Sequence, residues 1–332
     1  MQELKKIDLY DIALEIGKSI NHLPLTYQTF GPQLGTAPVV VVNHALTGNS
    51  NVAGENGWWR NLIGPDKTID TGYFTIVAFN IPGNGYDGNV DNLISNYTDF
   101  TIRDVAQIFW QGLSYLNIGK VHSVIGGSLG GAIAWEMAVL KPEKIDHIIP
   151  IATDWKATDW MIGNLLIQDQ ILTNSADPIS DARLHAMLLY RTPQSVNNRF
   201  LRNRQDNQSL YDIENWLVHH GNALKDRFTL SAYKLMNHLL KTNDITRNRT
   251  GLIETLKTVR GNIHIVAVDT DYFFTADECR DSFEVLRHIY NNVGYHEIHS
   301  IHGHDAFLIE QDQLNKILQS IFTIKKQYNE ST

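Results

Sequence analysis

Three short runs of apolar, mostly β-branched residues constrain the fold of this chain, because each run ends in a polar turn that contains glycine. The runs are Val39 to Val42, Phe74 to Phe79 and Val121 to Ile125. Such runs are typical of strands buried on both faces of a parallel sheet. Parallel strands need crossover helices, and the pattern predicts one over Thr101–Leu116, with Thr101 as N-cap and Asp104 as its capping partner. The first half of the chain is therefore predicted to be α/β.

The alternation of strands and helices stops after Asp154 and resumes near residue 250. The intervening residues show helical patterns (DARLHAMLLYR, DIENWLVHH, SAYKLMNHLLK) and lack an apolar run typical of a buried strand. Around this segment, strands are expected at Ile145–Ile151, Ile263–Val268 and about Ile298–Ile301, and helices at Thr275–Asn291 and Asp305 to about Phe322. We therefore predict a sheet-containing core, 1–154 and 250–332, with a helical cap, 155–249, inserted between two core strands.

Composition excludes several classes of protein. With 332 residues, 43% hydrophobic and 19% charged, the chain can bury a sizeable core. Its 28 basic and 36 acidic residues give a net charge of −8 without a basic block, so no nucleic-acid partner is expected. Charges are scattered through the first residues, and no window approaches the ~18 apolar residues of a membrane helix. A soluble, cytoplasmic protein without a membrane partner is predicted.

The segment Gly126-Gly127-Ser128-Leu129-Gly130 fits G-x-S-x-G and lies where a predicted strand ends and a predicted helix begins. In this context the motif is typical of a nucleophile elbow, a strained turn that exposes the serine hydroxyl above the sheet. The amide of Leu129 lies beside this hydroxyl at a helix N-terminus. We therefore predict that Ser128 is a nucleophile, and a purely structural glycine turn is the alternative.

A catalytic serine needs a base, and the base needs an orienting acid. With this elbow, the chain order is serine, acid, histidine, each after a later strand. His304 lies between the last predicted strand and the last helix, and the glycine before it favours it over His302. Asp269 and Asp271 both follow the strand predicted at Ile263–Val268, and sequence geometry does not choose between them as the acid.

Three further patterns point to other chemistry and are weaker. GNGYDG (83–88) fits G-x-G-x-x-G, but the residues after it do not open a helix, so no dinucleotide cofactor is expected. Cys279, the single cysteine, excludes an internal disulfide and is expected to pack as a small apolar residue. Side chains of a strand alternate between its faces, so the following histidines cannot all converge and no metal is expected. They are His296, His299, His302 and His304.

Five segments, taken together, resemble the homoserine O-acetyltransferase family of α/β-hydrolase-fold enzymes. They are NHALTGNS (43–50), GWWRNLIGPDKTIDTGYF (57–74), GGSLGG (126–131), ARLHAMLLYRT (182–192) and GHDAFL (303–308). The resemblance implies an α/β-hydrolase fold, with a mostly parallel sheet flanked by helices and an inserted helical cap. It also implies transfer of an acetyl group from acetyl-CoA, a co-substrate and not a resident cofactor, to the hydroxyl of L-homoserine in methionine biosynthesis. A homodimer formed through the cap is expected.

The resemblance also implies a catalytic triad. Ser128 resembles the family's nucleophile and His304 its base. The family's acid lies in an SD-x-L-F segment, and the matching text here is TDYFF, which selects Asp271 over Asp269.

The remaining site residues are implied by the resemblance in the same way. The amide of Leu46, in HALTG, resembles the second oxyanion donor, alongside that of Leu129. Arg183 and Tyr190 resemble residues that line the substrate tunnel, and Arg183 is expected to bind the amino-acid carboxylate. Asp305 resembles the residue that receives the substrate ammonium. A zwitterionic substrate needs one fixed cation and one fixed anion, which this pair supplies.

One segment departs from the family's pattern. The family usually has Gly-Gly-Cys-x-Gly-Ser-Thr-Gly-Pro where this chain has PGNGYDGNVDN (82–92). The segment is expected near the entrance, so the donor could instead be succinyl-CoA, or the acceptor serine. An esterase or thioesterase, in which water replaces the alcohol, is the alternative enzyme. A non-catalytic binding or scaffold protein is the alternative from another class.

Overall fold

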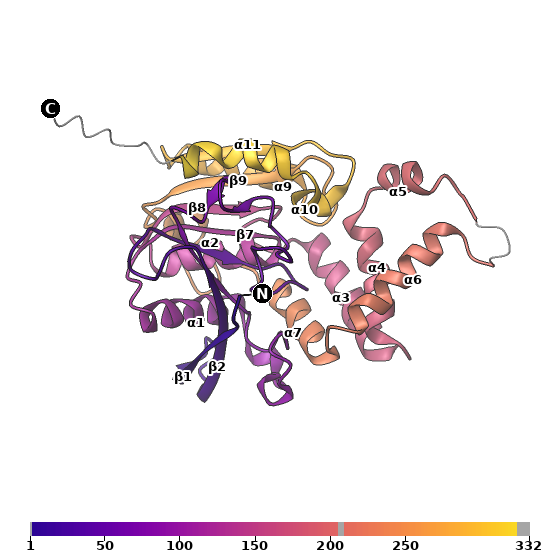
Figure 1. Ribbon diagram of the computed structural model, residues 1–332, viewed down its shortest axis with the longest axis horizontal. Helices are drawn as coiled ribbons and strands as arrows, with labels where there is room; N and C mark the ends of the chain where they lie inside the picture. The colour runs from indigo at the N-terminus through magenta and orange to yellow at the C-terminus, as the bar shows by residue number, and fades with distance from the viewer. Residues whose placement is uncertain (1, 205–208, 324–332) are drawn as a thin grey trace.

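A twisted eight-stranded sheet forms the centre of the computed structural model, which describes residues 2–204 and 209–323 (Figure 1). The strand order is β1-β2-β6-β3-β7-β8-β9-β10. β1 and β2 are antiparallel to each other, β2 is antiparallel to β6, and the strands from β6 to β10 are parallel. Their bounds are β1 Lys5–Ala13, β2 Ser19–Phe30, β3 Val39–Asn43, β6 Thr75–Phe79, β7 Val121–Gly127, β8 Ile145–Ile151, β9 Asn262–Val268 and β10 Val293–Ile298.

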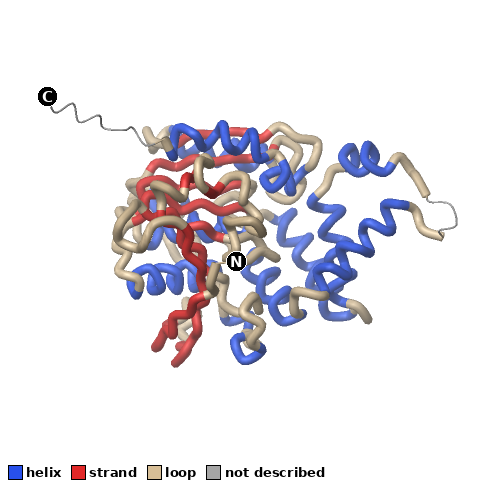
Figure 2. Tube along the Cα trace, in the orientation of Figure 1, coloured by secondary structure: helices blue, strands red, loops and turns tan. Residues whose placement is uncertain are grey.

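Helices cover both faces of this sheet, as Figure 2 shows by the helices above and below the strands. The core helices are α1 Ile102–Tyr115, α2 Leu129–Leu140, α9 Ala276–Arg287, α10 Ala306–Ile309 and α11 Gln311–Phe322. α1, α2 and α9 share one buried apolar cluster with the sheet, and α11 shares a second cluster on the opposite face. Burial from both sides explains why β3 consists of valines up to Asn43, since burying each valine side chain fully stabilises the fold by roughly 1.5–3 kcal/mol.

The predicted start of α1 is confirmed. The Thr101 hydroxyl accepts a bond from the amide of Asp104 at 3.3 Å, and the Asp104 carboxylate accepts one from the amide of Thr101 at 2.8 Å. This reciprocal pair satisfies two amides that the helix cannot bond internally, and it fixes where the chain turns into the helix.

The two ends of the sheet differ from the prediction. The β1–β2 hairpin was not expected, because its residues alternate apolar and polar (KKIDLYDIA) and only one face is buried. The last strand is β10, Val293–Ile298, and not 298–301; as an edge strand with half-buried residues it lacks an apolar run. The final helix is also interrupted, because Glu310, with φ −84° and ψ 50°, separates α10 from α11.

In the described residues, six helices lie between β8 and β9. We call residues 155–249 the cap, keeping the predicted name and bounds. The helices are α3 Asp159–Asn174, α4 Pro178–Tyr190, α5 Pro193–Phe200, α6 Asp212–Lys225, α7 Leu230–Lys241 and, just beyond the cap, α8 Leu252–Leu256. In Figure 1 α3 to α6 stand to one side of the sheet, and α7 lies between them and the core.

The cap enters and leaves the core at one place. The amide of Ala157 donates to the Asn243 carbonyl at 2.7 Å, and the amide of Ile245 donates to the Trp155 carbonyl at 3.2 Å. Buried cap residues such as Met161 and Tyr233 belong to the same apolar cluster as α1 and α2. In residues 2–204 and 209–323, no helix has both the length and the apolar character needed to span a membrane.

Candidate active site

Ser128 joins β7 to α2 in a strained backbone conformation. Its φ of 54° and ψ of −123° lie where non-glycine residues are rarely found. The surroundings hold this conformation, because the Ser128 amide donates to the Ile151 carbonyl at 2.8 Å and its carbonyl accepts from the amide of Gly131 at 2.9 Å. The side chain makes no capping bond to α2, so the hydroxyl is not used by the helix.

Glycines are required beside this serine because three backbone segments meet there. A Cβ atom added to Gly130 would lie 2.2 Å from the carbonyl oxygen of Asn43 at the end of β3. One added to Gly126 would lie 2.4 Å from the carbonyl carbon of Gly130. The Asn43 amide group also donates to the Gly130 carbonyl at 3.2 Å, which ties β3 to the start of α2. The local fold is that of the predicted nucleophile elbow.

His304 and Asp271 form a buried pair at the same edge of the sheet, each about 3% exposed. His304 Nδ1 lies 2.7 Å from Asp271 Oδ2. The other carboxylate oxygen, Oδ1, accepts the backbone amides of Phe273 at 2.6 Å and Phe274 at 3.1 Å. Because Nδ1 is engaged by the carboxylate, Nε2 is the ring nitrogen available for proton exchange.

Asp269 and His302, the alternatives for the acid and the base, bond other residues. The Asp269 carboxylate lies 3.1 Å from His299 Nδ1 and accepts the amide of Ser300 at 3.0 Å. His302 Nδ1 lies 2.8 Å from the Ser195 hydroxyl. Within the described residues, no group of three or more His, Cys, Asp or Glu side chains is arranged to hold a metal ion.

Aromatic rings surround the imidazole of His304. Ring centroids lie 5.2 Å away for Phe273, 5.3 Å for Tyr190 and 5.7 Å for Phe307. Burial raises the pKa of Tyr190 to about 12, so its hydroxyl stays protonated at neutral pH. Gly303 brings the histidine loop close to Tyr190: its φ is +67°, and an added Cβ would lie 2.9 Å from the Tyr190 carbonyl oxygen. These contacts fix the ring and limit water around it.

The two predicted oxyanion donors lie at the ends of adjacent strands. Leu129 is the first residue of α2, and a first-turn amide has no acceptor within its helix. Leu46 lies in a turn after β3 that is closed by a bond of 2.9 Å from the Gly48 amide to the Ala45 carbonyl. Both amides belong to backbone segments that touch the elbow, and we interpret them as a preformed pair of donors.

His44 supports this turn and was missed by the sequence analysis. Its Nε2 accepts the amide of Ile81 at 2.9 Å, so Nδ1 carries the proton and donates to the Ala45 carbonyl at 2.8 Å. Burial lowers its pKa to about 4, so the ring is neutral. Only its place directly after β3 could have suggested this role.

The atypical segment 82–92 is tied to the same turn. The side-chain amide of Asn84 donates to the Asn80 side-chain oxygen at 3.2 Å, and that oxygen also accepts the amide of Ser50 at 2.9 Å. All three residues are buried. Through Asn84, the atypical segment therefore contacts buried polar groups next to the turn that carries Leu46.

Charged side chains from the cap face this site. The Arg183 guanidinium lies 5.9 Å from the Tyr190 ring centroid. Asp305 is paired with Arg191, with 2.9 Å between Nε and Oδ2. Arg227 Nη1 donates to the Thr47 carbonyl at 2.9 Å. Sequence reasoning missed Arg191 and Arg227, because only the folding of the cap brings them to the core.

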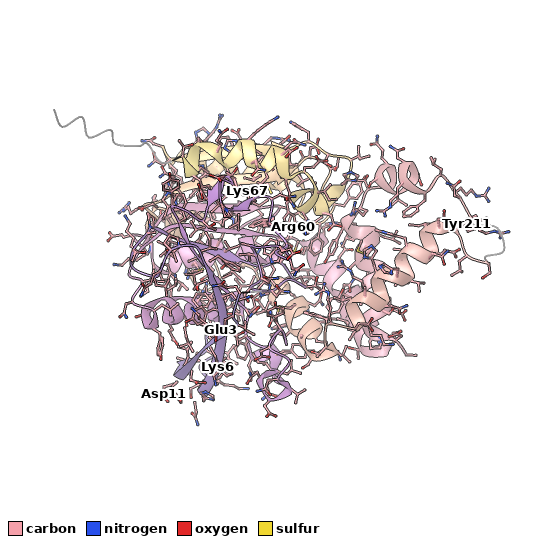
Figure 3. All side chains as sticks on the ribbon, in the orientation of Figure 1. Glu3, Lys6, Asp11, Arg60, Lys67 and Tyr211 are labelled. Atoms are coloured by element: carbon pink, nitrogen blue, oxygen red, sulfur yellow. The ribbon has the colours of Figure 1, made fainter. Side chains whose placement is uncertain are left out.

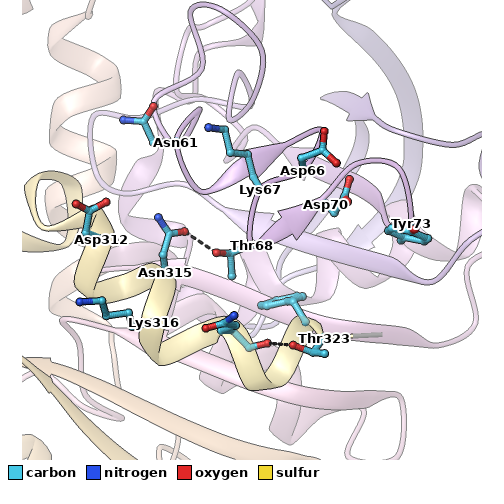
Figure 4. A pocket seen from close by; sticks show the side chains of 12 residues that line it. Asn61, Asp66, Lys67, Thr68, Asp70, Tyr73, Asp312, Asn315, Lys316 and Thr323 are labelled. Carbon is cyan, nitrogen blue, oxygen red and sulfur yellow. Dashed lines mark hydrogen bonds between the residues drawn. The ribbon is translucent and has the colours of Figure 1, made fainter. Parts of the chain in front are cut away.

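A polar surface cavity of about 740 Å³ lies elsewhere, between α11 and the short ribbon of β4 (Ile63–Gly64) and β5 (Ile69–Asp70) (Figure 4). Thr68 and Asn315 bridge it with a hydrogen bond of 2.7 Å. None of the predicted site residues lines this cavity. Figure 3 shows Lys67 on this side of the molecule and Tyr211 at the far end of the cap. We do not assign the cavity to the reaction.

Comparison with known proteins identifies relatives over almost the whole chain. The family model described as alpha/beta hydrolase fold matches residues 38–217. A homoserine O-acetyltransferase of Cyclobacterium marinum is 34% identical, over 94% of this chain and 92% of the relative. One of Salinibacter ruber is 30% identical, over 93% and 94%.

Solved structures agree on the fold. A homoserine O-acetyltransferase from Bacillus anthracis superposes with a TM-score of 0.85 at 20% identity, covering 98% of each chain. Esterase E22 superposes with a TM-score of 0.86 at 18% identity, covering 97% of this chain and 100% of the esterase. At these identities the likeness concerns the fold alone, and it confirms the predicted α/β-hydrolase fold.

Proposed function

The chain belongs to the homoserine O-acetyltransferase family of α/β-hydrolase-fold proteins, and from this premise we propose that it acetylates L-homoserine. Acetyl-CoA is the donor, and the acetyl group passes through an acyl-serine on Ser128 in a step of methionine biosynthesis. The observation that carries the proposal is the buried pair of His304 and Asp271, 2.7 Å apart, at the sheet edge where the strained turn holds Ser128.

In the first half-reaction, Ser128 Oγ attacks the thioester carbonyl carbon while His304 Nε2 takes the hydroxyl proton. The amides of Leu46 and Leu129 donate to the carbonyl oxygen as it becomes negative. The carbon–sulfur bond then breaks, and His304 returns the proton to the sulfur of the departing CoA. The product is an acetyl ester on Ser128.

Asp271 acts on His304 throughout both half-reactions. Two backbone amides hold its carboxylate, so the remaining oxygen is fixed against Nδ1–H of the imidazole. This bond keeps the proton on Nδ1 and leaves Nε2 as the acceptor. It also stabilises the imidazolium that forms when Ser128 loses its proton.

In the second half-reaction, the acceptor hydroxyl gives its proton to His304 Nε2 and attacks the acyl carbon. Arg183 binds the acceptor carboxylate, and Asp305 receives its ammonium. Asp305 is held in place by Arg191, with 2.9 Å between Nε and Oδ2. Tyr190, between Arg183 and His304, forms the wall along which the acceptor lies.

Hydrolysis is the second candidate, because esterase E22 shares the fold with a TM-score of 0.86. Water would then replace the alcohol on the same acyl-enzyme. Arg183 favours transfer over hydrolysis, because a guanidinium beside His304's aromatic wall serves an anionic acceptor and has no use in the attack of water. Succinyl-CoA as donor and serine as acceptor use the same steps.

Assembly and location complete the proposal. The cap carries exposed apolar side chains on α3, among them Trp160 at 54%, Leu166 at 52% and Ile167 at 47% exposed. Large exposed apolar groups on one helix favour the expected homodimer through the cap. The reaction is expected in the cytoplasm.

A donor and acceptor screen tests the proposed function. Acetyl-CoA or succinyl-CoA is mixed with homoserine, serine or buffer alone, and release of the free CoA thiol is followed. We expect homoserine to accelerate thiol release from acetyl-CoA above every other combination. Equal rates with homoserine and buffer would support simple hydrolysis instead.

A further inference from the structure

Arg227 connects the cap to the turn that carries the oxyanion donor. It lies in the loop between α6 and α7, and its Nη1 donates to the Thr47 carbonyl at 2.9 Å. Thr47 directly follows Leu46 in the chain. One guanidinium nitrogen therefore bonds the turn, and no other described residue forms a hydrogen bond to the remaining N–H groups of the fork, which could bind a ligand.

The cap presents more positive than negative charge toward the core at this place. Arg191 is neutralised by Asp305 at 2.9 Å. Arg183 and Arg227 have no carboxylate within 4.0 Å in the part of the chain that the structure describes. Partial desolvation, and then the charge of Arg183, lower the pKa of Arg227. Arginine nevertheless keeps its proton at neutral pH, so Arg183 and Arg227 are two like charges that act on each other.

The charge of Arg183 opposes that of Arg227, and an anion bound between the two guanidinium groups would relieve this repulsion. A carboxylate suits this position, because each of its oxygens accepts from one guanidinium. His220 of the cap does not add charge at neutral pH, because burial, and then the charge of Arg183, lower its pKa. The two arginines are therefore the cations that an anionic ligand would meet.

We propose that Arg227 is a second binding residue for the acceptor carboxylate. Arg227 binds the carboxylate from the side of the Leu46 turn, and Arg183 binds it from the side of Tyr190. This inference rests on the proposed function and adds to it a residue that selects acceptors with a carboxylate. Replacing Arg227 should therefore slow transfer to acceptors that carry a negative carboxylate more than transfer to acceptors that lack it.

The position of both arginines favours the acceptor over the donor as the source of this anion. Arg227 bonds the residue next to Leu46, and Arg183 lies over Tyr190, whose ring is 5.3 Å from the His304 ring. Each guanidinium group is thus linked through one neighbouring residue to a group of the candidate site: Arg227 through Thr47 to Leu46, and Arg183 through Tyr190 to His304. In homoserine a short carbon chain separates carboxylate from hydroxyl, whereas the phosphates of CoA lie at the far end of its pantetheine arm.

The test combines one variant with two acceptors. Arg227→Gln and the wild type are assayed with saturating acetyl-CoA against L-homoserine and against L-homoserine amide, which keeps the hydroxyl and the ammonium but lacks the negative charge. We expect kcat/KM for homoserine to fall about 10- to 100-fold, the scale of one charge-assisted hydrogen bond. With the amide, the fall should be less than about threefold.

Two further variants control for charge and folding. Arg227→Lys keeps the positive charge but loses the planar fork, so it should retain part of the preference for homoserine over its amide. Arg260→Gln is the matched control: Arg260 Nη1 also donates to one backbone carbonyl, that of Lys257 at 3.3 Å, but at the start of β9, opposite the acid loop. Arg260→Gln should leave kcat/KM for homoserine and for its amide unchanged.

Three results would overturn the inference. An equal fall for homoserine and its amide would mean that Arg227 acts only on the oxyanion turn. If kcat/KM fell for neither acceptor, Arg227 would not be part of the acceptor site. A rise in KM for acetyl-CoA alone would assign it to the donor. The proposed function fails separately, if the wild type transfers no acetyl group to homoserine.

Discussion

Asp271→Asn should nearly abolish turnover, and the geometry around the carboxylate gives the reason. Oδ1 accepts the amides of Phe273 and Phe274, at 2.6 and 3.1 Å, so the asparagine must keep its carbonyl oxygen there. Its NH₂ group then faces His304 Nδ1, where Asp271 Oδ2 lies at 2.7 Å. The ring must respond by moving its proton to Nε2, and Nε2 can no longer accept the proton of Ser128.

The size of this effect follows from the loss of the correct tautomer and of the charge that stabilises the imidazolium. In other triads the same change costs on the order of 10⁴ in kcat, which corresponds to roughly 5.5 kcal/mol. The fold should survive, because the two amides keep their acceptor and the side chain keeps its volume. Thermal unfolding of the variant checks this.

The assay is stopped-flow release of the CoA thiol from acetyl-CoA, which reports the acylation of Ser128 directly. Asp269→Asn is the matched control, since Asp269 bonds His299 and Ser300 at the surface, and it should change acylation by less than tenfold. If Asp269→Asn were the slower variant, or if Asp271→Asn acylated within tenfold of the wild type, the reasoning would be refuted.

Three further predictions concern the acceptor, the histidine loop and pH. Arg183→Ala should raise the acceptor KM and lower transfer efficiency by roughly 2–4 kcal/mol, while acylation by acetyl-CoA alone is spared; separate assays of the two half-reactions measure this. Gly303→Ala should destabilise the fold by about 1–3 kcal/mol in urea, because φ is +67° and the new Cβ would lie 2.9 Å from the Tyr190 carbonyl oxygen. Burial lowers the pKa of His122 and His264 to about 4, so the contribution of these two histidines to stability should be full above pH 6.5 and fall toward pH 4, as urea titrations across that range can measure.

The parts of the fold that could be predicted from the sequence are those specified by short-range patterns. The valine run of β3 is apolar because both faces of that strand are covered, and the capping box of α1 lies within four residues. The β1–β2 hairpin and β10 lie at the edges of the sheet, where burial is one-sided or partial. Such strands lack a continuous apolar run, and their pairing depends on distant residues.

Some residues of the candidate site could likewise be predicted from local sequence, and others could not. The elbow at Ser128 is a local motif, whereas the choice between Asp269 and Asp271 depends on which carboxylate the following backbone amides turn back to bond. An aspartate at either position could accept the amide two residues further along, so the sequence around them does not choose between the two. Arg191 and Arg227 come from the cap, and their contacts with Asp305 and Thr47 span more than 100 residues. No local pattern could have placed them.

The most direct test of acetyl transfer through Ser128 is the intact mass of the protein before and after an acceptor is added. Wild-type protein mixed with acetyl-CoA alone should gain the mass of one acetyl group, and Ser128→Ala should gain none. On addition of L-homoserine the adduct should disappear much faster than in buffer, with O-acetylhomoserine as the product. An identical adduct on Ser128→Ala, or an adduct lost equally fast with and without homoserine, would contradict the account.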